Sequence, residues 1–494
     1  MPLVTPSFRQ LRPILKVRLT VLLGALLFTQ AQALVARETR QELAQSKATA
    51  QSLSRAEALE DLVAFAKRLR EESSYLELRR AAPLAAIKDL EKRLPETISQ
   101  ADFARELQKI LSPMGDCHSS ISCAALDDEA GQYLPFRLAI AAGGLVAVTR
   151  SNDAFVEPGF PFLVAIDGKP VKTWLDAALK YEPLGSPSQH LYRGSKGIRR
   201  LDILRRDLGL AASGKVQLTF ADHTGKTRQT ALPCRDRSSS MAEIKIGESR
   251  KIGTIGYLRL PEMDDALIPE AKRWMTEFRD SSGLIIDVRG NGGGTYGLMH
   301  ALFGYFRPAE APPFVCNIAA YRLAPSFSED HIEYRPTYRR DWKGWTAAEG
   351  RVIDASLKTF KPCFKLPAQQ FSAWHFMVLK HEGFQFHYDK PVIVLCDQSC
   401  ISATDGFLAA FAELPKVTLM GRASRGGSGS SRSVDLPSGI TCKLSTMASF
   451  RPDGKTFEGF GVDVDVALDS PPTDFINGQD SVLEQALRRL ATSK

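Results

Sequence analysis

The chain has 494 residues, of which 44% are hydrophobic and 24% are charged. This length exceeds one compact core, so roughly two to four domains are expected, and the balanced composition excludes a largely disordered or fibrous protein. The formal charge of +8 is modest and forms no dense basic run beyond the N-terminus, so no nucleic-acid partner is predicted.

Residues 1–33 have the pattern of a secretory signal peptide. Basic residues precede the apolar run from Leu19 to Phe28, and Ala31 and Ala33 supply small side chains at a cleavage site. A membrane anchor is the alternative, but crossing a bilayer needs about 20 apolar residues and this run is roughly half as long. We therefore expect export, a mature chain that begins near Leu34, and no stable membrane insertion after cleavage.

Export would place the eight cysteines in an oxidising compartment. Their pairing cannot be deduced from sequence, and a disulfide between Cys316 and Cys363 is only one possibility. A zinc site is another possibility, but the usual two pairs of spaced ligands are missing, so no metal and no cofactor are predicted. The residues that such a zinc site would use are Asp116, Cys117, His118 and Cys123.

Residues 34–125 form the first predicted domain, which is helical and ends in a loop around His118. Apolar residues recur at helical spacing behind a Ser54–Glu57 capping box, and a second amphipathic helix is expected between Ser99 and Pro113. Packing is the expected role of these helices.

Residues 130–235 form the second predicted domain, in which short strands and turns replace the helical pattern. The stretch 159–171 resembles the corresponding segment of PDZ domains, which bind a peptide end by adding it as a strand to a sheet edge. Leu134 and Phe136 are candidate substrate contacts in this region, and a small β-domain without a ligand is the alternative. The expected strands are 144–149, 162–166 and 215–220.

Residues 240–475 alternate strands with helices, which favours an α/β layer with a partly parallel sheet. An insertion at 298–390, rich in aromatic and basic residues, could cover the active site or form a partner surface. An amphipathic helix within 476–494 closes the chain. The strands expected in this domain are 252–260, 283–287, 391–395 and 417–420, and a helix is expected at 403–413.

The strand 283–287 runs into a glycine-rich turn that permits two interpretations. Its glycines satisfy the G-x-G-x-x-G pattern of dinucleotide-binding proteins, but this pattern is weak alone and an exported protein meets little NAD. The alternative is an oxyanion hole, in which each N–H group aimed at a developing negative charge lowers the barrier by about 3 to 4 kcal/mol. We favour an oxyanion hole with Gly292 or Gly293 as a donor.

Ser402 stands at a second turn, between the strand 391–395 and the helix 403–413. A serine at a strand-to-helix turn is exposed at the sheet edge and lies close to helix N–H groups, which suits a nucleophile. By itself this serine could equally be a helix N-cap.

Five blocks around these residues occur in the order seen in C-terminal-processing peptidases, so residues 130–470 resemble that family of serine peptidases. The resemblance implies a ClpP/crotonase-like α/β catalytic domain of layered sheet and helices, preceded by a β-rich PDZ-like domain and an N-terminal helical domain. It also implies that Ser402 is the nucleophile and that Gly292 or Gly293, with the Ala403 amide, forms the oxyanion hole. The blocks are 253–260, 287–293, 402–405, 421–428 and 458–462.

Gly427 stands where tail-specific members of this family carry a catalytic lysine. The chain instead resembles the tricorn-core branch, which implies that His118 is the base and Glu458 its support, with Cys117 where that branch has a serine. A histidine with a pKa near 6.5 can take the serine proton, so activity is expected to fall at low pH through an ionisation of about 6 to 7. Asp405 is either a substrate contact beside the nucleophile or a carboxylate that favours the helix dipole.

The sequence therefore predicts an exported serine endopeptidase, periplasmic or secreted, that hydrolyses peptides or the C-terminal regions of proteins. The alternative is a catalytically inactive, PDZ-containing binding or scaffold protein of the same fold, because the lysine is missing. The presence of His118, Ser402 and Glu458 favours the enzyme. Peptide or protein substrates are the expected partners, and the sequence indicates no oligomeric state.

Overall fold

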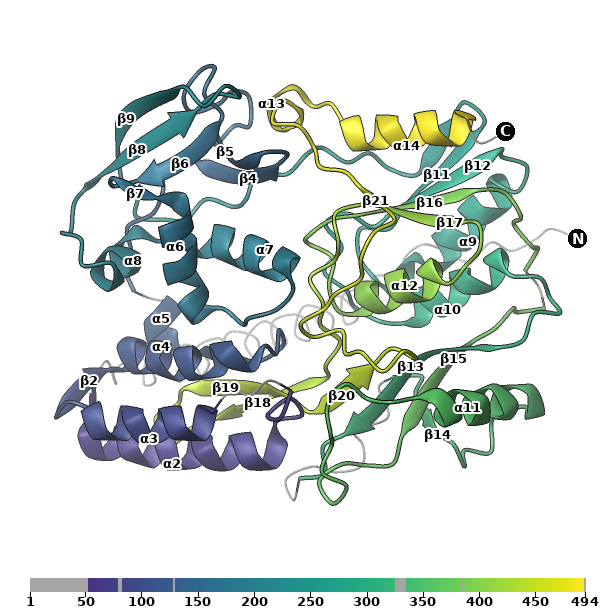
Figure 1. The fold of residues 1–494 in the computed structure, drawn as a ribbon, viewed down its shortest axis with the longest axis horizontal. Coiled ribbons are helices and arrows are strands. Elements are labelled where there is room, and N and C mark those ends of the chain that lie inside the picture. Colours follow the sequence, from purple (N-terminus) through teal and green to yellow (C-terminus); the bar gives the residue numbers. More distant parts are fainter. Residues whose placement is uncertain (1–51, 79–81, 128, 325–334, 384, 493–494) are drawn as a thin grey trace, which may run out of the picture.

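A computed structural model of the chain describes residues 52–78, 82–127, 129–324, 335–383 and 385–492 (Figure 1). The expected signal peptide and the expected start of the mature chain lie outside these residues. Within them, no helix is long and apolar enough to cross a membrane. In Figure 1 the N-terminal helices lie at the lower left, the β-rich unit above them, and the large mixed sheet at the upper right.

The N-terminal helices begin where their capping residues predict. Ser54 and Glu57 form the expected capping box, and Ser99 accepts a hydrogen bond from Asp102 at the start of the third helix. The apolar faces of these helices share one core with Leu436 and Leu444, so this layer is completed by distant strands of the chain. Its elements are β1 (Ser52–Ser54), α2 (Arg55–Glu72), α3 (Pro83–Arg93), β2 (Thr97–Ser99), α4 (Gln100–Leu111) and η1 (Ser112–Met114).

The β-rich unit is an antiparallel sheet in the order β4-β5-β6-β8-β9, with β7 paired to β6. The strands expected here are present within one residue of their expected bounds. Trp174 is fully buried against the sheet and donates its indole N–H to Ile166 O at 2.9 Å. The elements are β4 (Arg137–Ala141), β5 (Gly144–Val148), β6 (Phe162–Ile166), β7 (Lys169–Pro170), α6 (Val171–Ala178), α7 (Pro187–Gly197), α8 (Leu201–Asp207), β8 (Lys215–Ala221) and β9 (Thr227–Pro233).

The central sheet has the order β10-β11-β12-β16-β17-β21, and every pair beyond β10-β11 is parallel. Alternate residues of β12 point to opposite faces, so Leu284 and Ile286 join one core while Ile285 packs under the C-terminal helix in another. Both faces are therefore covered, as parallel sheets require. The elements are β10 (Arg250–Ile252), β11 (Ile255–Arg259), α9 (Ile268–Glu277), β12 (Gly283–Asp287), α10 (Gly297–Phe303), β16 (Val392–Cys396), α12 (Ala403–Ala412), β17 (Val417–Gly421), β21 (Val466–Ala467) and α14 (Ser481–Thr492).

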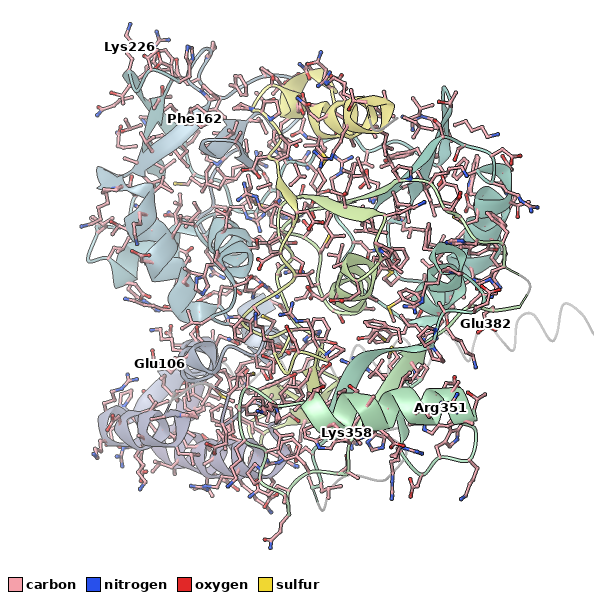
Figure 2. All side chains as sticks on the ribbon, turned by 45° about the vertical axis from the view of Figure 1, so that its right-hand side comes forward. Glu106, Phe162, Lys226, Arg351, Lys358 and Glu382 are labelled. Atoms are coloured by element: carbon pink, nitrogen blue, oxygen red, sulfur yellow. The ribbon has the colours of Figure 1, made fainter. Side chains whose placement is uncertain are left out.

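The expected insertion folds into part of a second sheet, in the order β14-β15-β13-β20. Its last strand, β20, comes from beyond the insertion, so the insertion pairs with a later part of the chain in addition to being joined by its two ends. Figure 2 shows Arg351 and Lys358 on the outer side of α11, away from this sheet. The elements are β13 (Phe314–Tyr321), β14 (Tyr338–Arg339), α11 (Ala347–Thr359), β15 (His375–Leu379) and β20 (Met447–Phe450).

A three-stranded sheet in the order β18-β19-β3 joins a late part of the chain to the segment that follows the N-terminal helices. β3 follows the loop that carries His118, so this pairing fixes where that loop enters the molecule. The remaining elements of both regions are short. They are β3 (Ser120–Ser122), α5 (Ala124–Asp127), η2 (Leu179–Tyr181), η3 (Asp265–Leu267), η4 (Gly304–Phe306), β18 (Ser431–Asp435), β19 (Thr441–Ser445) and α13 (Asp474–Asn477).

The suggested disulfide is wrong, because all eight cysteines, which lie in described segments, are free. Cys316 is buried in the core and its thiol donates to Met377 O, whereas Cys363 is exposed. Burial in an apolar core, rather than pairing, accounts for Cys316.

Candidate active site

Ser402 occupies a strained turn between β16 and α12. Its backbone has φ of 65° and ψ of −124°, a region that residues with a side chain rarely adopt and that costs about 1 to 3 kcal/mol. Such strain at a strand-to-helix turn is typical of nucleophiles that project from the edge of a sheet. An ordinary N-cap does not need this backbone, so helix capping alone does not explain the strain at Ser402.

Asp405 holds this turn in place from inside the protein. Its carboxylate accepts the Ser402 N–H at 2.9 Å and the Gly427 N–H at 3.0 Å, and it also accepts the Ser424 hydroxyl. The side chain has no exposed surface, and burial raises its pKa to about 7. The hydrogen bonds of this buried carboxylate tie the Ser402 turn to the following loop.

The glycine-rich turn packs directly against Ser402. Gly293 has φ of 99°, and a side chain there would place its Cβ 2.7 Å from Ser402 Cβ. The Gly293 N–H donates to Asn291 Oδ1 at 2.9 Å, so it is already used. Gly292 and Ala403 have no acceptor for their N–H groups within the described residues, which makes these two the available oxyanion donors.

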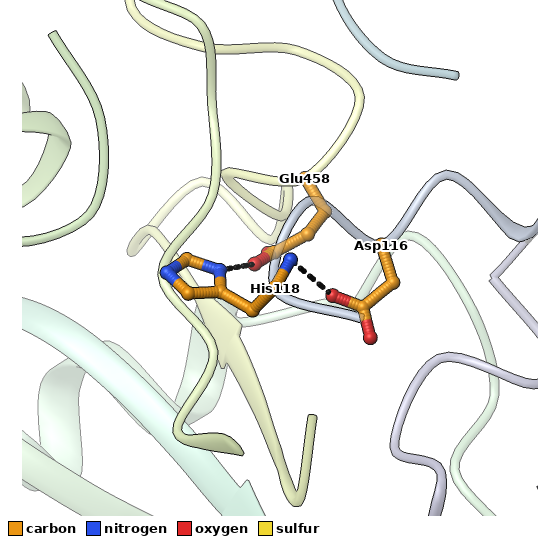
Figure 3. A group of neighbouring side chains, drawn as sticks. All are labelled: Asp116, His118 and Glu458. Atoms are coloured by element: carbon orange, nitrogen blue, oxygen red, sulfur yellow. Dashed lines mark hydrogen bonds and ion pairs between the residues drawn. The ribbon is translucent and has the colours of Figure 1, made fainter. Parts of the chain in front are cut away.

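His118 reaches the site on the loop before β3, and Asp116 fixes that loop by accepting the His118 N–H at 3.0 Å (Figure 3). A Cβ on Gly427 would lie 3.2 Å from His118 Cε1 and 3.2 Å from Ile401 Cδ1. The imidazole therefore fills the space beside residue 427, which explains physically why glycine stands there. Within the described residues no hydrogen bond joins the His118 ring to the Ser402 hydroxyl.

His118 and Glu458 face one another, with Nδ1 and Oε1 separated by 3.9 Å (Figure 3). Burial raises the pKa of Glu458 to about 7, and the nearby Asp116 carboxylate adds to this effect. The contact is therefore not an ion pair at rest, because the imidazole is neutral. An approach of about 1 Å would convert it into a hydrogen bond. Burial first, and then surrounding cations, lower the pKa of His118 to about 3, the cations being Arg335, Lys443, Arg425 and Arg193.

Tyr75 is a part of the site that the sequence did not indicate. Its hydroxyl donates to Glu458 Oε2 at 2.7 Å, while the Ser428 and Gly429 N–H groups donate to Oε1 at 2.6 and 3.0 Å. Tyr75 itself is fully buried and accepts the Ser449 N–H at 3.1 Å. No local motif surrounds this tyrosine, so only its tertiary position identifies it.

Arg335, from the expected insertion, contacts the turn that holds Glu458. Its guanidinium donates to Ser428 O at 3.1 Å, to Gly429 O at 3.2 Å and to Tyr296 OH at 3.1 Å. The insertion therefore stabilises the turn at Ser428 and Gly429 through hydrogen bonds.

The zinc grouping considered from the sequence does not assemble. Cys123 packs in the apolar core under the N-terminal helices, away from the others. Asp116, His118 and Glu458 do come within 4.8 Å of one another. Both carboxylates already accept several hydrogen bonds, so this trio is an internal network rather than a vacant set of ligands.

Leu134 and Phe136, the other expected substrate contacts, have buried side chains. They are 1% and 2% exposed and belong to the core of the β-rich unit. Cys117 is buried beside His118, and burial raises the pKa of its thiol, so it is a neutral packing group where the tricorn-core branch has a serine.

Comparison with known proteins matches residues 254–468 to a family described as Peptidase family S41. No curated protein has a matching sequence. The structure of mature CPAF complexed with lactacystin is 17% identical, with a TM-score of 0.63, covering 88% of this chain and 98% of that chain. A mutant of CPAF is 16% identical with a TM-score of 0.64, covering 89% and 98%. The photosystem II D1 C-terminal processing protease is 15% identical with a TM-score of 0.43, covering 88% and 98%.

The likeness to CPAF, at this low identity, shows a shared fold. The span matched to the family contains the Ser402 turn, the glycine-rich turn and Glu458, whereas Tyr75 and His118 precede it.

Proposed function

We propose that Ser402 is the nucleophile, His118 its base and Glu458 the support of that base, in a serine-type peptidase whose residues 254–468 match peptidase family S41. The observation that carries this proposal is the strained backbone of Ser402, packed on the glycine-rich turn. A serine hydroxyl is too weak an acid to attack a peptide bond unaided, so a neighbouring base is required.

The base in this proposal is the neutral imidazole of His118. Nδ1 faces Glu458, which leaves Nε2 for the proton of Ser402. The imidazolium that then forms is unfavourable among the surrounding cations, and an ionised Glu458 favours it. Glu458 therefore supports catalysis in its charged form, which it reaches only above its raised pKa of about 7.

The oxyanion in this proposal is stabilised by the N–H groups of Gly292 and Ala403. Ala403 is the first residue of α12, so the positive end of the helix dipole adds to its N–H. Each such donor contributes about 3 to 4 kcal/mol to lowering the barrier.

The substrates of a peptidase are peptides or proteins, and we propose that this chain acts on peptide or protein C-terminal regions as an exported enzyme. The antiparallel β-rich unit supports a PDZ-like role, since an extended peptide can add to a free sheet edge. The signal-like sequence of residues 1–33 supports a periplasmic or secreted location.

An inactive binding protein of the same fold is the second candidate, motivated by the absence of lysine at position 427. The position of His118 against Gly427 weakens this candidate, because a different base occupies that space.

Hydrolysis of a fluorogenic peptide library by the mature protein tests the proposal. Wild-type protein should cleave some members, Ser402→Ala should cleave none, and the neighbouring Ser399→Ala should cleave as the wild type does. A folded wild-type protein that cleaves no peptide would favour the binding protein. Equal activity in Ser402→Ala would place the nucleophile elsewhere.

A further inference from the structure

Three aromatic side chains gather on the surface of the insertion, just before α11. The rings of Tyr338 and Trp342 stack with their centres 3.9 Å apart, and Trp345 meets both rings edge-on, at 5.7 Å and 5.0 Å. Although these side chains contact one another, Tyr338 remains 37% exposed and Trp342 42% exposed. Large rings that lie together at the surface of a folded chain, rather than singly, indicate an interaction site.

The aromatic cluster is held in a fixed arrangement by its own segment. Tyr338 lies in β14, which pairs with β15, and the indole N–H of Trp345 donates to Arg339 O at 2.8 Å. The capping box of Thr346 and Glu349 then begins α11 immediately after Trp345. Side chains that are already ordered lose little conformational entropy when a partner covers them, so this cluster is prepared for binding.

An excess of positive charge surrounds the cluster. Residues 338–365 contain seven basic and three acidic residues, and each of the three carboxylates already pairs with a cation. These pairs are Asp341 with Arg339 at 2.9 Å, Asp354 with Arg340 at 2.6 Å, and Glu349 with Lys380 at 3.0 Å. The cations of this segment that form no direct ion pair with any described residue are Lys343, Arg351, Lys358, Lys361 and Lys365.

A hollow of about 350 Å³ brings the rings and the unpaired cations together. Its lining includes the indoles of Trp342 and Trp345 and the charged side chains of Lys343 and Arg351. Aromatic surface and unpaired positive charge therefore border the same depression, and a partner that fits it needs both an apolar part and negative charge.

The hollow lies on the outer side of the insertion. Figure 2 shows Arg351 and Lys358 on the face of α11 that points away from the sheet, whereas Ile353 packs in the core beneath the helix. In Figure 1 the strands β13 and β15 lie between α11 and α12, the helix that follows Ser402. A partner on this face would therefore leave the Ser402 turn uncovered.

We propose that this aromatic–basic patch, formed by Tyr338, Trp342, Trp345, Lys343 and Arg351, docks on the surface of a bilayer that contains anionic phospholipid. Trp and Tyr rings prefer the headgroup level of a membrane, where one part of the ring is in apolar surroundings and the other is wet. Lys and Arg side chains beside them are attracted to anionic headgroups. This inference goes beyond the peptidase reaction and does not depend on it.

The packing of the rings favours a bilayer over a nucleic acid as the partner. Nucleobases bind by stacking on the open faces of aromatic side chains. Trp342 already stacks on Tyr338, and Gly344 packs on the same indole, where a Cβ would lie 2.1 Å from a ring atom. Ring surface that a base would need is thus taken up inside the cluster.

Co-sedimentation of the mature protein with vesicles tests the proposal. One set of vesicles is phosphatidylcholine alone, and the other is equal parts phosphatidylcholine and phosphatidylglycerol. The wild type should bind the anionic vesicles about 10- to 100-fold more tightly, because each cation near such a surface contributes about fivefold. The preference should weaken as the salt concentration rises.

Substitutions then locate the contact. The double variant Lys343→Gln with Arg351→Gln should bind anionic vesicles about 10-fold more weakly. The control is Lys215→Gln with Lys226→Gln, which removes the same charge from exposed positions of the β-rich unit and should bind within about twofold of the wild type.

The aromatic part is tested separately. Trp342→Ser should bind anionic vesicles about 5- to 10-fold more weakly, whereas Trp342→Phe, which keeps a ring, should retain most of the affinity. If Trp342→Ser lowers the Tm, Trp342→Phe and the double variant of Lys343 and Arg351 decide.

Equal binding of the wild type to both kinds of vesicle would overturn the inference, and so would anionic binding that persists in the double variant of Lys343 and Arg351. An equal loss in the control pair would show that overall charge, rather than this patch, attracts the protein. A duplex DNA oligomer that binds as tightly as the vesicles and is lost in the same variants would show a general polyanion site instead. Because no peptide is cleaved in these measurements, failure of the proposed function would leave the membrane contact standing.

Discussion

The proposed nucleophile and its proposed base reach the candidate active site in different ways. Ser402 and the two proposed oxyanion donors, Gly292 and Ala403, lie on neighbouring turns at one edge of the parallel sheet, within the span matched to the peptidase family. His118 and Tyr75 come from the N-terminal part, and Tyr75 meets Glu458 across 383 positions of the chain. Ser402 is thus positioned by local backbone geometry, whereas the position of His118 depends on how distant segments pack together.

Removing the nucleophile should have the largest effect. Ser402→Ala should lower kcat/KM by about 10⁴-fold or more, because the hydroxyl forms the covalent bond. The free energy of unfolding should stay within about 1 kcal/mol of the wild type, as measured by urea denaturation. Residual activity above one percent would show that another group attacks the substrate.

Removing the base should be almost as costly, although His118 comes from another part of the chain. His118→Ala should match Ser402→Ala in kcat/KM, and the double variant should be no worse, because members of one catalytic unit are not additive. His223→Ala, at an exposed histidine, is the control. Near-normal turnover in His118→Ala would show that His118 is not the base for Ser402.

The pH profile should report Glu458 rather than His118. With a pKa lowered to about 3, His118 stays neutral across the working range, whereas Glu458, raised to about 7, gains its proton as the pH falls through 7. We therefore expect kcat/KM to decline below about pH 7. The sequence analysis attributed this loss of activity at low pH to protonation of His118, whereas here it is attributed to protonation of Glu458.

Glu458→Gln tests that assignment, since glutamine cannot ionise. It should cost about 10- to 100-fold at pH 8 and flatten the acid limb. If kcat/KM of this variant still declined below pH 7 as in the wild type, the decline would be attributed to protonation of His118.

Tyr75→Phe should have a smaller effect, about 3- to 10-fold in kcat/KM, because it removes one of three donors to Glu458. The hydrogen bond from Tyr75 stabilises the charged form of Glu458, so its loss should raise the pKa of Glu458. The decline of kcat/KM at low pH should then begin at a higher pH. Tyr181→Phe is the control, because it removes the hydroxyl that donates to Asp207 in the β-rich unit. It should leave the pH dependence of kcat/KM unchanged. A fall in activity without a shift of the limb would mean that Tyr75 acts only in packing.

The smallest effect should appear in stability. Ser402→Gly should be more stable than Ser402→Ala by about 1 kcal/mol, because glycine relieves a φ of 65° that alanine cannot. A higher Tm for the alanine variant would argue against strain at this turn.

The sequence predicted several strands and the capped helices well, because each depends on local patterns. The expected strand 252–260 is wrong as one strand, because a turn at Gly253 divides it into the antiparallel pair β10 and β11. The expected strand 283–287 and the capping box at Ser54 are present as predicted. The sequence did not indicate that Asp405, Leu134 and Phe136 are buried, because burial depends on what packs around a residue rather than on its neighbours in sequence.

Tyr75 is a residue that the sequence analysis missed for the same reason. Its role depends on one hydrogen bond to a residue that only the fold brings near. The choice between Gly292 and Gly293 likewise needed the Asn291 side chain, which uses the Gly293 N–H.

The identity of the nucleophile is tested most directly by labelling with an active-site-directed fluorophosphonate, followed by peptide mapping. Wild-type protein should carry the label on Ser402, Ser402→Ala should carry none, and His118→Ala should label far more slowly, because the base no longer activates the hydroxyl. Label on Ser399 or Ser428, or a folded wild-type protein that takes no label, would contradict the assignment of Ser402 as the nucleophile.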